Sequence, residues 1–101
     1  MYNLTAIAYD KRGRILAVGR NSYVKTHPLQ ARLAEKVGLT DSIYLHAEVS
    51  CLVKIRDPAK IRKFVVFRYD RHGRPRNARP CKICQQALQD FGVHNVSYTT
   101  G

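Results

Sequence analysis

The chain has 101 residues, the length of one small domain, and its 45% hydrophobic content is that of a folded protein and excludes a disordered one. Its 18 Lys and Arg against 7 Asp and Glu give a net charge of +11, which favours a polyanionic partner or a phosphorylated substrate. The apolar runs are too short to span a membrane and the N-terminus lacks the charge order of a signal peptide, so we expect a cytoplasmic protein.

The chain begins with a predicted β-hairpin. Two short segments rich in β-branched, aromatic and small apolar residues flank a turn that contains glycine, and they predict strands at 4–9 and 15–20. Two helices follow in the prediction. The first covers 27–38, begins near Pro28 and ends at a glycine, and the second covers 43–56, where apolar residues recur at helical spacing.

The second half of the chain alternates strand and helix. We expect a buried strand at 63–69, a loop rich in Gly and Pro at 70–80, a helix at 81–92 and a short strand at 94–100. The element order is therefore β-β-α-α-β-α-β, which is typical of an α/β fold built around one sheet. No linker or repeat divides the chain, so residues 1–101 are expected to form a single domain.

Two short motifs carry the chemistry. A His-x-Glu sequence places His46 and Glu48 near the start of one predicted helix, and a Pro-Cys-x-x-Cys sequence places Cys81 and Cys84 at the start of another. Thiolates at a helix start together with an imidazole are ligands that zinc prefers, and three protein ligands leave a fourth position for water. A carboxylate such as Glu48 can take the proton from that water and pass it on.

Two other interpretations of these motifs remain open. Cys51 could be a fourth ligand that, together with Cys81, Cys84 and His46, completes a closed structural zinc site. Against it, residues five apart on a helix diverge by about 140°, and Cys51 lies in an apolar run where a cysteine packs as a small hydrophobic residue. The Cys-x-x-Cys sequence could also belong to a metal-free redox protein.

The quoted stretches "HAE" and "PCKIC" match the signature H-x-E…P-C-x-x-C, and the chain resembles the zinc-dependent cytidine/deoxycytidylate deaminase superfamily over nearly its whole length. The resemblance implies a three-layer α/β/α sandwich around a mixed sheet. It also implies Zn²⁺ as cofactor, with His46, Cys81 and Cys84 as its ligands and Glu48 as the proton shuttle. The superfamily usually adds a further strand, so the domain is expected to be short at its C-terminus.

The resemblance further implies substrate contacts. The backbone of Ala47 would contact the base, Asn21 would contact sugar or base, and Lys25 and His27 would meet phosphate or base, although His27 could instead cap the following helix. Four tyrosines could stack a base or simply serve as core or rim aromatics: Tyr23, Tyr44, Tyr69 and Tyr98.

The loop before the second motif is rich in arginine. Because it runs into the predicted zinc helix, Arg71, Arg74, Arg76 and Arg79 could lie at the mouth of the pocket and bind phosphate. The alternative is a solvated loop without a single role.

The activity that the resemblance implies is hydrolytic deamination of a cytosine ring to uracil with release of ammonia, on a dCMP-like nucleotide or on single-stranded nucleic acid. One alternative is an adenosine deaminase acting on tRNA or DNA. Another is a non-catalytic nucleic-acid-binding module with a structural zinc, against which Glu48 argues. The missing strand has three explanations: a partner subunit that completes the sheet in a homo-oligomer, a minimal domain, or a cut sequence.

Overall fold

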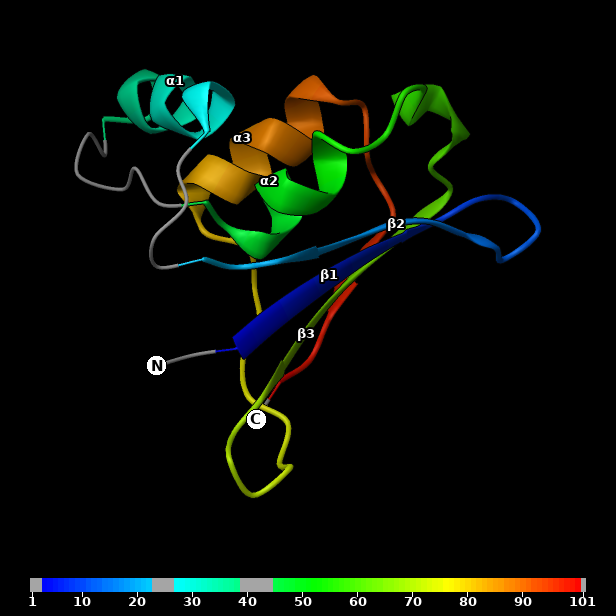
Figure 1. Ribbon diagram of the computed structural model, residues 1–101, viewed down its shortest axis with the longest axis vertical. Coiled ribbons are helices and arrows are strands. Elements are labelled where there is room, and N and C mark those ends of the chain that lie inside the picture. Colours follow the sequence, from blue (N-terminus) through cyan, green and yellow to red (C-terminus); the bar gives the residue numbers. More distant parts are fainter. Residues whose placement is uncertain (1–2, 23–26, 39–44, 101) are drawn as a thin grey trace.

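The computed structural model describes residues 3–22, 27–38 and 45–100 (Figure 1). It confirms the predicted order β-β-α-α-β-α-β, with one additional single-turn 3₁₀ helix, η1. The elements are β1 Asn3–Tyr9, β2 Ile15–Arg20, α1 Pro28–Lys36, α2 Ala47–Leu52, η1 Pro58–Lys60, β3 Lys63–Tyr69, α3 Lys82–Asp90 and β4 Val96–Tyr98.

The four strands form one mixed sheet in the order β2-β1-β3-β4. β1 is antiparallel to both β2 and β3, and β4 runs parallel to β3. Ala6 on β1 lies opposite Gly19 on β2 and Val66 on β3, and all three positions are buried. Because side chains alternate between the faces of a strand, this register defines the face of the sheet that carries the core.

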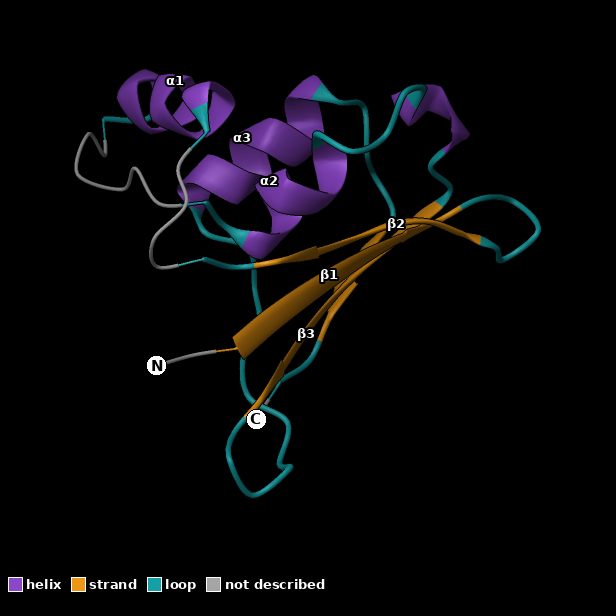
Figure 2. Ribbon diagram, in the orientation of Figure 1, coloured by secondary structure: helices purple, strands orange, loops and turns teal. Residues whose placement is uncertain are grey.

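The helices α1, α2 and α3 lie on one face of the sheet (Figure 2). α2 packs directly against β1 and β2, and α3 contacts both α1 and α2. The α/β class and the mixed sheet are confirmed, and the described residues supply two of the three expected layers. Within the described ranges, no helix is both long and apolar enough to cross a bilayer.

A glycine allows α2 to approach the sheet closely. A Cβ atom on Gly19 would collide with the carbonyl oxygen of Ala47 and the amide nitrogen of Cys51, both in the backbone of α2. Glycine within a strand often marks such a close approach of another backbone segment. The absence of a side chain at Gly19 therefore fixes how near α2, and the residues at its start, come to the sheet.

The second helix is shorter than predicted. The prediction covered 43–56, of which 43 and 44 lie outside the described residues, whereas α2 begins at Ala47 and ends at Leu52. Pro58 disfavours helical backbone at Asp57, whose side chain instead accepts a hydrogen bond from the Ala59 N–H at 3.2 Å. This accounts for the break before η1, whereas α2 itself already ends at Leu52, with Val53 as its C-cap residue.

Candidate metal centre

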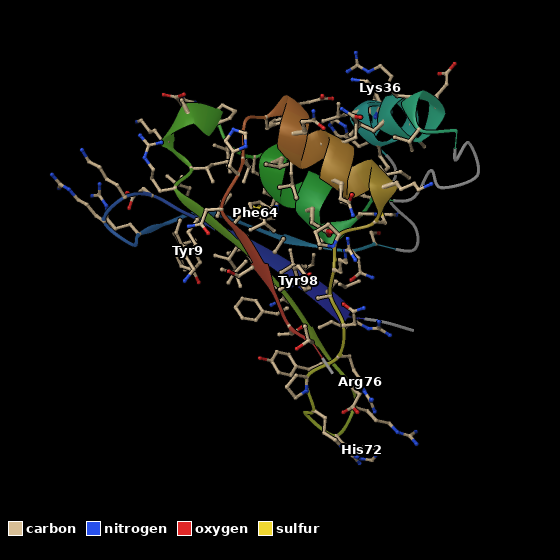
Figure 3. All side chains as sticks on the ribbon, turned by 180° about the vertical axis from the view of Figure 1, so that it is seen from behind. Tyr9, Lys36, Phe64, His72, Arg76 and Tyr98 are labelled. Atoms are coloured by element: carbon tan, nitrogen blue, oxygen red, sulfur yellow. The ribbon has the colours of Figure 1, made fainter. Side chains whose placement is uncertain are left out.

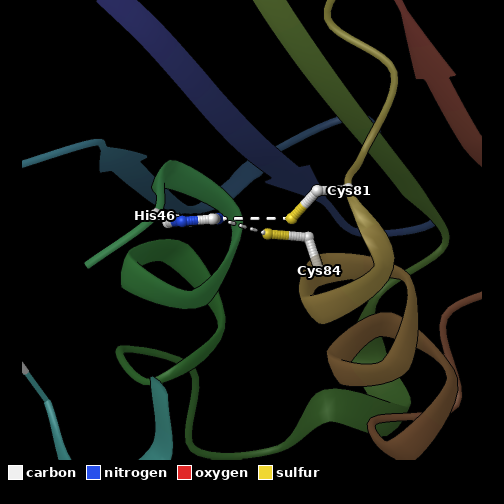
Figure 4. Close-up of side chains that lie close together, drawn as sticks. All are labelled: His46, Cys81 and Cys84. Carbon is white, nitrogen blue, oxygen red and sulfur yellow. Dashed lines mark hydrogen bonds between the residues drawn. The ribbon is translucent and has the colours of Figure 1, made fainter. Parts of the chain in front are cut away.

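The two motifs meet where α2 and α3 begin (Figure 4). His46 is the N-cap residue of α2 and Cys81 is the N-cap residue of α3, both with extended backbone. The side chain of His46 makes no capping hydrogen bond, so its imidazole is directed to other partners. Cys84 lies within the first turn of α3, on the buried side of that helix.

The three side chains form one compact group. The Nδ1 atom of His46 lies 3.3 Å from the Cys84 sulfur and 3.4 Å from the Cys81 sulfur. All three possible ligand atoms lie within 4.8 Å of one another. Cys84 is buried, His46 is half-buried and Cys81 is exposed, so the group opens toward solvent on one side. One imidazole nitrogen with two sulfurs is a donor set that fits Zn²⁺.

The two sulfurs differ in their readiness to ionise. Hydrogen bonding to Cys84 lowers the pKa of the Cys81 thiol to about 4, and His46 adds to this effect. The same hydrogen bond, together with burial, raises the pKa of Cys84 well above its usual value. The pair therefore holds one proton between its sulfurs at neutral pH, and Cys81 is the thiolate that is ready to bind a cation.

Glu48 places a carboxyl group beside the sulfurs. Its residue is only 4% exposed. Burial raises its pKa, while hydrogen bonds from its own backbone N–H and from Cys84 act in the opposite direction. In a regular helix, residues two apart point about 200° from each other. His46 precedes the helix instead of lying within it, which lets both side chains reach the same region.

Cys51 is separate from this group. Its thiol donates a hydrogen bond to the Ala17 carbonyl oxygen at 3.4 Å, and the residue is fully buried in the core. Burial raises its pKa to about 11. A closed site completed by Cys51 does not fit this arrangement, whereas the role of a small hydrophobic residue does.

Two glutamines that sequence analysis missed hold the motifs in place. The Oε1 atom of the fully buried Gln30, on α1, accepts a hydrogen bond from the His46 N–H at 3.3 Å. Gln85 donates from Nε2 to the Pro80 carbonyl oxygen at 2.8 Å and so fixes the turn that precedes Cys81. The sequence signal that could have predicted the role of Gln30 is its position next to the apolar stripe of the predicted helix.

The structure places Asn21 next to the segment that leads to the metal centre. Its side-chain oxygen accepts a hydrogen bond from the Leu4 N–H at 2.9 Å. The N–H of the next residue, Ser22, donates to the Leu45 carbonyl oxygen at 2.8 Å, which brings this segment beside the residue before His46.

The other expected substrate contacts vary in position. Ala47 is the first residue of α2 and is fully buried. His27 is the N-cap residue of α1, where its Nδ1 accepts a hydrogen bond from the Leu29 N–H at 3.0 Å, so its capping role is confirmed. Lys25 lies outside the described residues, as do Tyr23 and Tyr44.

The arginine-rich loop projects away from the metal centre. Figure 3 shows His72 at the tip of this loop and Arg76 further back along it, at the end of the molecule opposite the helices. Asp70 stabilises the turn through a 2.9 Å ion pair with Arg76, and its carboxylate accepts hydrogen bonds from the backbone N–H groups of residues 72 and 74. Arg71, Arg74 and Arg76 are therefore not at the mouth of the site, whereas Arg79 lies two residues before Cys81.

Comparison with known proteins adds one finding about the fold. No protein-family model and no curated protein matches the chain in sequence. Among solved structures, the chain is similar to the crystal structure of a mutant cytidine deaminase from Mycobacterium tuberculosis, with a TM-score of 0.52 and 21% identity. The match covers 96% of this chain and 66% of the mycobacterial chain, so this chain spans slightly less than two thirds of that protein.

The likeness shows a cytidine-deaminase-like α/β fold. That fold and the group formed by His46, Cys81 and Cys84 fit the zinc cytidine deaminase superfamily.

Proposed function

We propose that the chain is a zinc-dependent hydrolytic deaminase that converts a cytosine ring to uracil with release of ammonia. Its substrate is a nucleotide similar to dCMP or a cytosine within single-stranded nucleic acid. The observation that carries the proposal is the buried carboxyl group of Glu48 beside a histidine and two cysteines whose ligand atoms lie within 4.8 Å of one another.

The proposed cofactor is Zn²⁺, held by Nδ1 of His46 and the sulfurs of Cys81 and Cys84. When bound there, Zn²⁺ supplies a water molecule whose pKa is lowered to about 7 and which can act as a nucleophile. Both sulfurs act as thiolates in this state, and their negative charges compensate that of the cation.

Glu48 moves the protons in this proposal. It takes a proton from the attacking water and delivers it to ring nitrogen N3. It then takes the remaining proton of the hydroxyl group added at C4 and passes it to the amine, which leaves as ammonia while the C4 carbonyl of uracil forms. Because burial raises the pKa of this carboxyl group, both its charged and its neutral form are accessible at a pH closer to neutrality than for an exposed glutamate. The Ala47 backbone and Asn21 orient the base, and the net charge of +11 attracts the phosphate of the substrate.

Two other functions make different use of the same residues. An adenosine deaminase would use His46, Cys81, Cys84 and Glu48 for attack at C6 of adenine, and the substrate panel below separates it from the main proposal. A non-catalytic module with a structural zinc gains nothing from a carboxyl group at Glu48, whose burial disfavours the charged form of this side chain.

The test combines metal content with turnover. Zinc-loaded protein is incubated with dCMP, cytidine, single-stranded DNA and tRNA, and released ammonia and base identity are measured. We expect turnover of a cytosine substrate, and we expect Glu48→Gln to keep its zinc while losing activity by about 10²–10⁴-fold. Unchanged turnover in Glu48→Gln would refute the assigned role of Glu48.

A matched pair of cysteine variants tests the ligand set. Cys84 and Cys51 are both fully buried, but only Cys84 belongs to the metal group. Cys84→Ala is expected to lose zinc and activity together, whereas Cys51→Ala is expected to keep one zinc per chain. Equal loss of zinc from both variants would show that the ligand set is wrong.

A further inference from the structure

Among the described residues, no helix covers the face of the sheet opposite α1, α2 and α3, and this face is partly apolar. Side chains alternate between the two faces of a sheet, so the strand residues next to the core positions point to this face. On it, Ile7 of β1 lies opposite Val18 of β2 and Val65 of β3. We call it the open face, and it is formed by Thr5, Ile7, Tyr9, Val18, Arg20, Lys63, Val65, Phe67 and Tyr69. None of these nine residues is fully buried in the part of the chain that the structure describes.

Aromatic rings are concentrated on the open face. The rings of Phe67 and Tyr69 lie nearly parallel, with centroids 6.4 Å apart and an interplanar angle of 15°. Tyr69 is 47% exposed, and Phe67 is half-buried. Tyr9 lies on the side of the sheet away from the helices, whereas Phe64 lies between sheet and helices (Figure 3). Exposed aromatic rings on a sheet are surfaces on which unpaired bases can stack.

The charge of this face is positive. The four described strands contain no acidic residue. Thr5 on β1 pairs with the exposed Arg20 on one side and with Phe67 on the other, so Arg20 and Phe67 lie in the same row across the sheet. The exposed Lys63 is the first residue of β3. At the other end of β3, the arginine-rich loop follows Tyr69 directly.

That loop adds positive charge beside Tyr69. Arg71 and Arg74 are exposed, and the single carboxylate of the loop, Asp70, is already paired with Arg76 at 2.9 Å. The loop meets β3 through a bridge between Tyr69 and Pro75, so its arginines stay close to the aromatic pair. Arginines that do not reach the metal centre thus extend the basic surface around the open face.

We propose that the open face binds single-stranded nucleic acid, with bases stacked on Phe67 and Tyr69 and phosphates bound by Arg20, Lys63 and the loop arginines. Charge complementarity selects this occupant, because a second copy of the chain would bring two basic faces together. The surface lies on the opposite side of the sheet from the helices that carry the metal centre, so binding there does not depend on deamination.

Two tyrosines provide a matched test. Tyr69 and Tyr98 are 47% and 39% exposed and lie on neighbouring strands, but Tyr98 pairs with the core position Val66 and faces the side of α3. Binding of a fluorescent oligothymidylate of about 20 nucleotides, longer than a typical single-strand site, is measured by anisotropy at increasing salt. Tyr69→Ala is expected to weaken binding about tenfold, as loss of one stacked base does, whereas Tyr98→Ala is expected to bind as wild type.

Charge variants test the phosphate contacts without touching the core. Arg20→Ala and Lys63→Ala alter exposed side chains, and each is expected to reduce the salt slope by about 0.7, the value for one phosphate contact with a single strand. Three results would overturn the proposal: no binding by wild type at low salt, equal binding by the Tyr69 and Tyr98 variants, or a wild-type dimer in sedimentation that Tyr69→Ala dissociates. The binding assay needs no turnover. The nucleic-acid proposal can therefore be refuted while the deaminase proposal stands, and the deaminase proposal can be refuted while this one stands.

Discussion

Replacing Gly19 by alanine tests how the metal centre is positioned. The added Cβ atom would collide with the Ala47 carbonyl oxygen and the Cys51 amide nitrogen and would lie 2.8 Å from the Cys51 Cα atom. All three atoms belong to the backbone of α2, so no flexible side chain can move aside, and the helix itself must shift. Overpacking of this kind costs about 1–3 kcal/mol, and we expect the upper end of that range.

The shift has a functional consequence, because α2 begins directly after His46 and carries Glu48. A domain of this length has a total stability of about 5–15 kcal/mol, so the variant should still fold. Its zinc affinity should fall by about 10–100-fold, as it does when groups that orient metal ligands are disturbed. Urea unfolding in the presence of chelator gives the stability, and competition with a zinc indicator gives the affinity.

Gly13→Ala is the control for this experiment. Gly13 has a φ angle of +77° in the β1–β2 turn, and among the described residues no other part of the chain comes within 4 Å of the place a Cβ atom would take. Alanine there therefore costs about 1–2 kcal/mol through backbone strain alone. We expect this variant to lose stability and to keep wild-type zinc affinity. If Gly19→Ala matched it in both measurements, α2 would not rest on the sheet at Gly19.

Three further predictions concern the thiols and the loop. In metal-free protein, iodoacetamide at pH 6 should modify Cys81 first, because the pKa of its thiol is lowered to about 4. Cys51, whose pKa is raised to about 11, should stay unmodified. Mass spectrometry locates the label, and bound zinc should protect Cys81 from modification. Zinc binding should release protons and strengthen as pH rises, because zinc binds the deprotonated forms of Cys84 and His46 and the pKa values of both groups are raised in the metal-free protein. Calorimetry in buffers of different ionisation enthalpy measures the release, and a pH-independent affinity would contradict this prediction. Asp70→Ala should speed trypsin cleavage in the arginine-rich loop while zinc content stays unchanged, and an unchanged cleavage rate would show that Asp70 does not hold this turn.

Local sequence signals predicted the strands and the metal group well. The strands at 15–20 and 63–69 have the predicted bounds, because their apolar residues lie between short stretches of charged or polar residues that include the turn glycines Gly13 and Gly73. Proline before Cys81 and the spacing of the two cysteines predicted a helix start, and the structure brings both sulfurs to His46 there. Identity and spacing of residues carry this information directly.

What depends on tertiary geometry was not visible in the sequence. The arginine-rich loop is adjacent to Cys81 along the chain, yet the turn held by Asp70 directs its tip away from the helices. A regular helix through 43–56 would separate the directions of His46 and Glu48, and only the observed start at Ala47 shows how both reach one region. The position of all described α-helices on one face of the sheet likewise follows from packing, and at Gly19 the backbone of α2 comes close to β2.

X-ray absorption at the zinc edge of metal-loaded protein tests the central claim most directly. One zinc per chain with two sulfur ligands at about 2.3 Å and two nitrogen or oxygen ligands at about 2.0 Å is the predicted result, since His46 and a water complete the coordination of Cys81 and Cys84. A third sulfur ligand, or a protein that binds no zinc, would contradict the account.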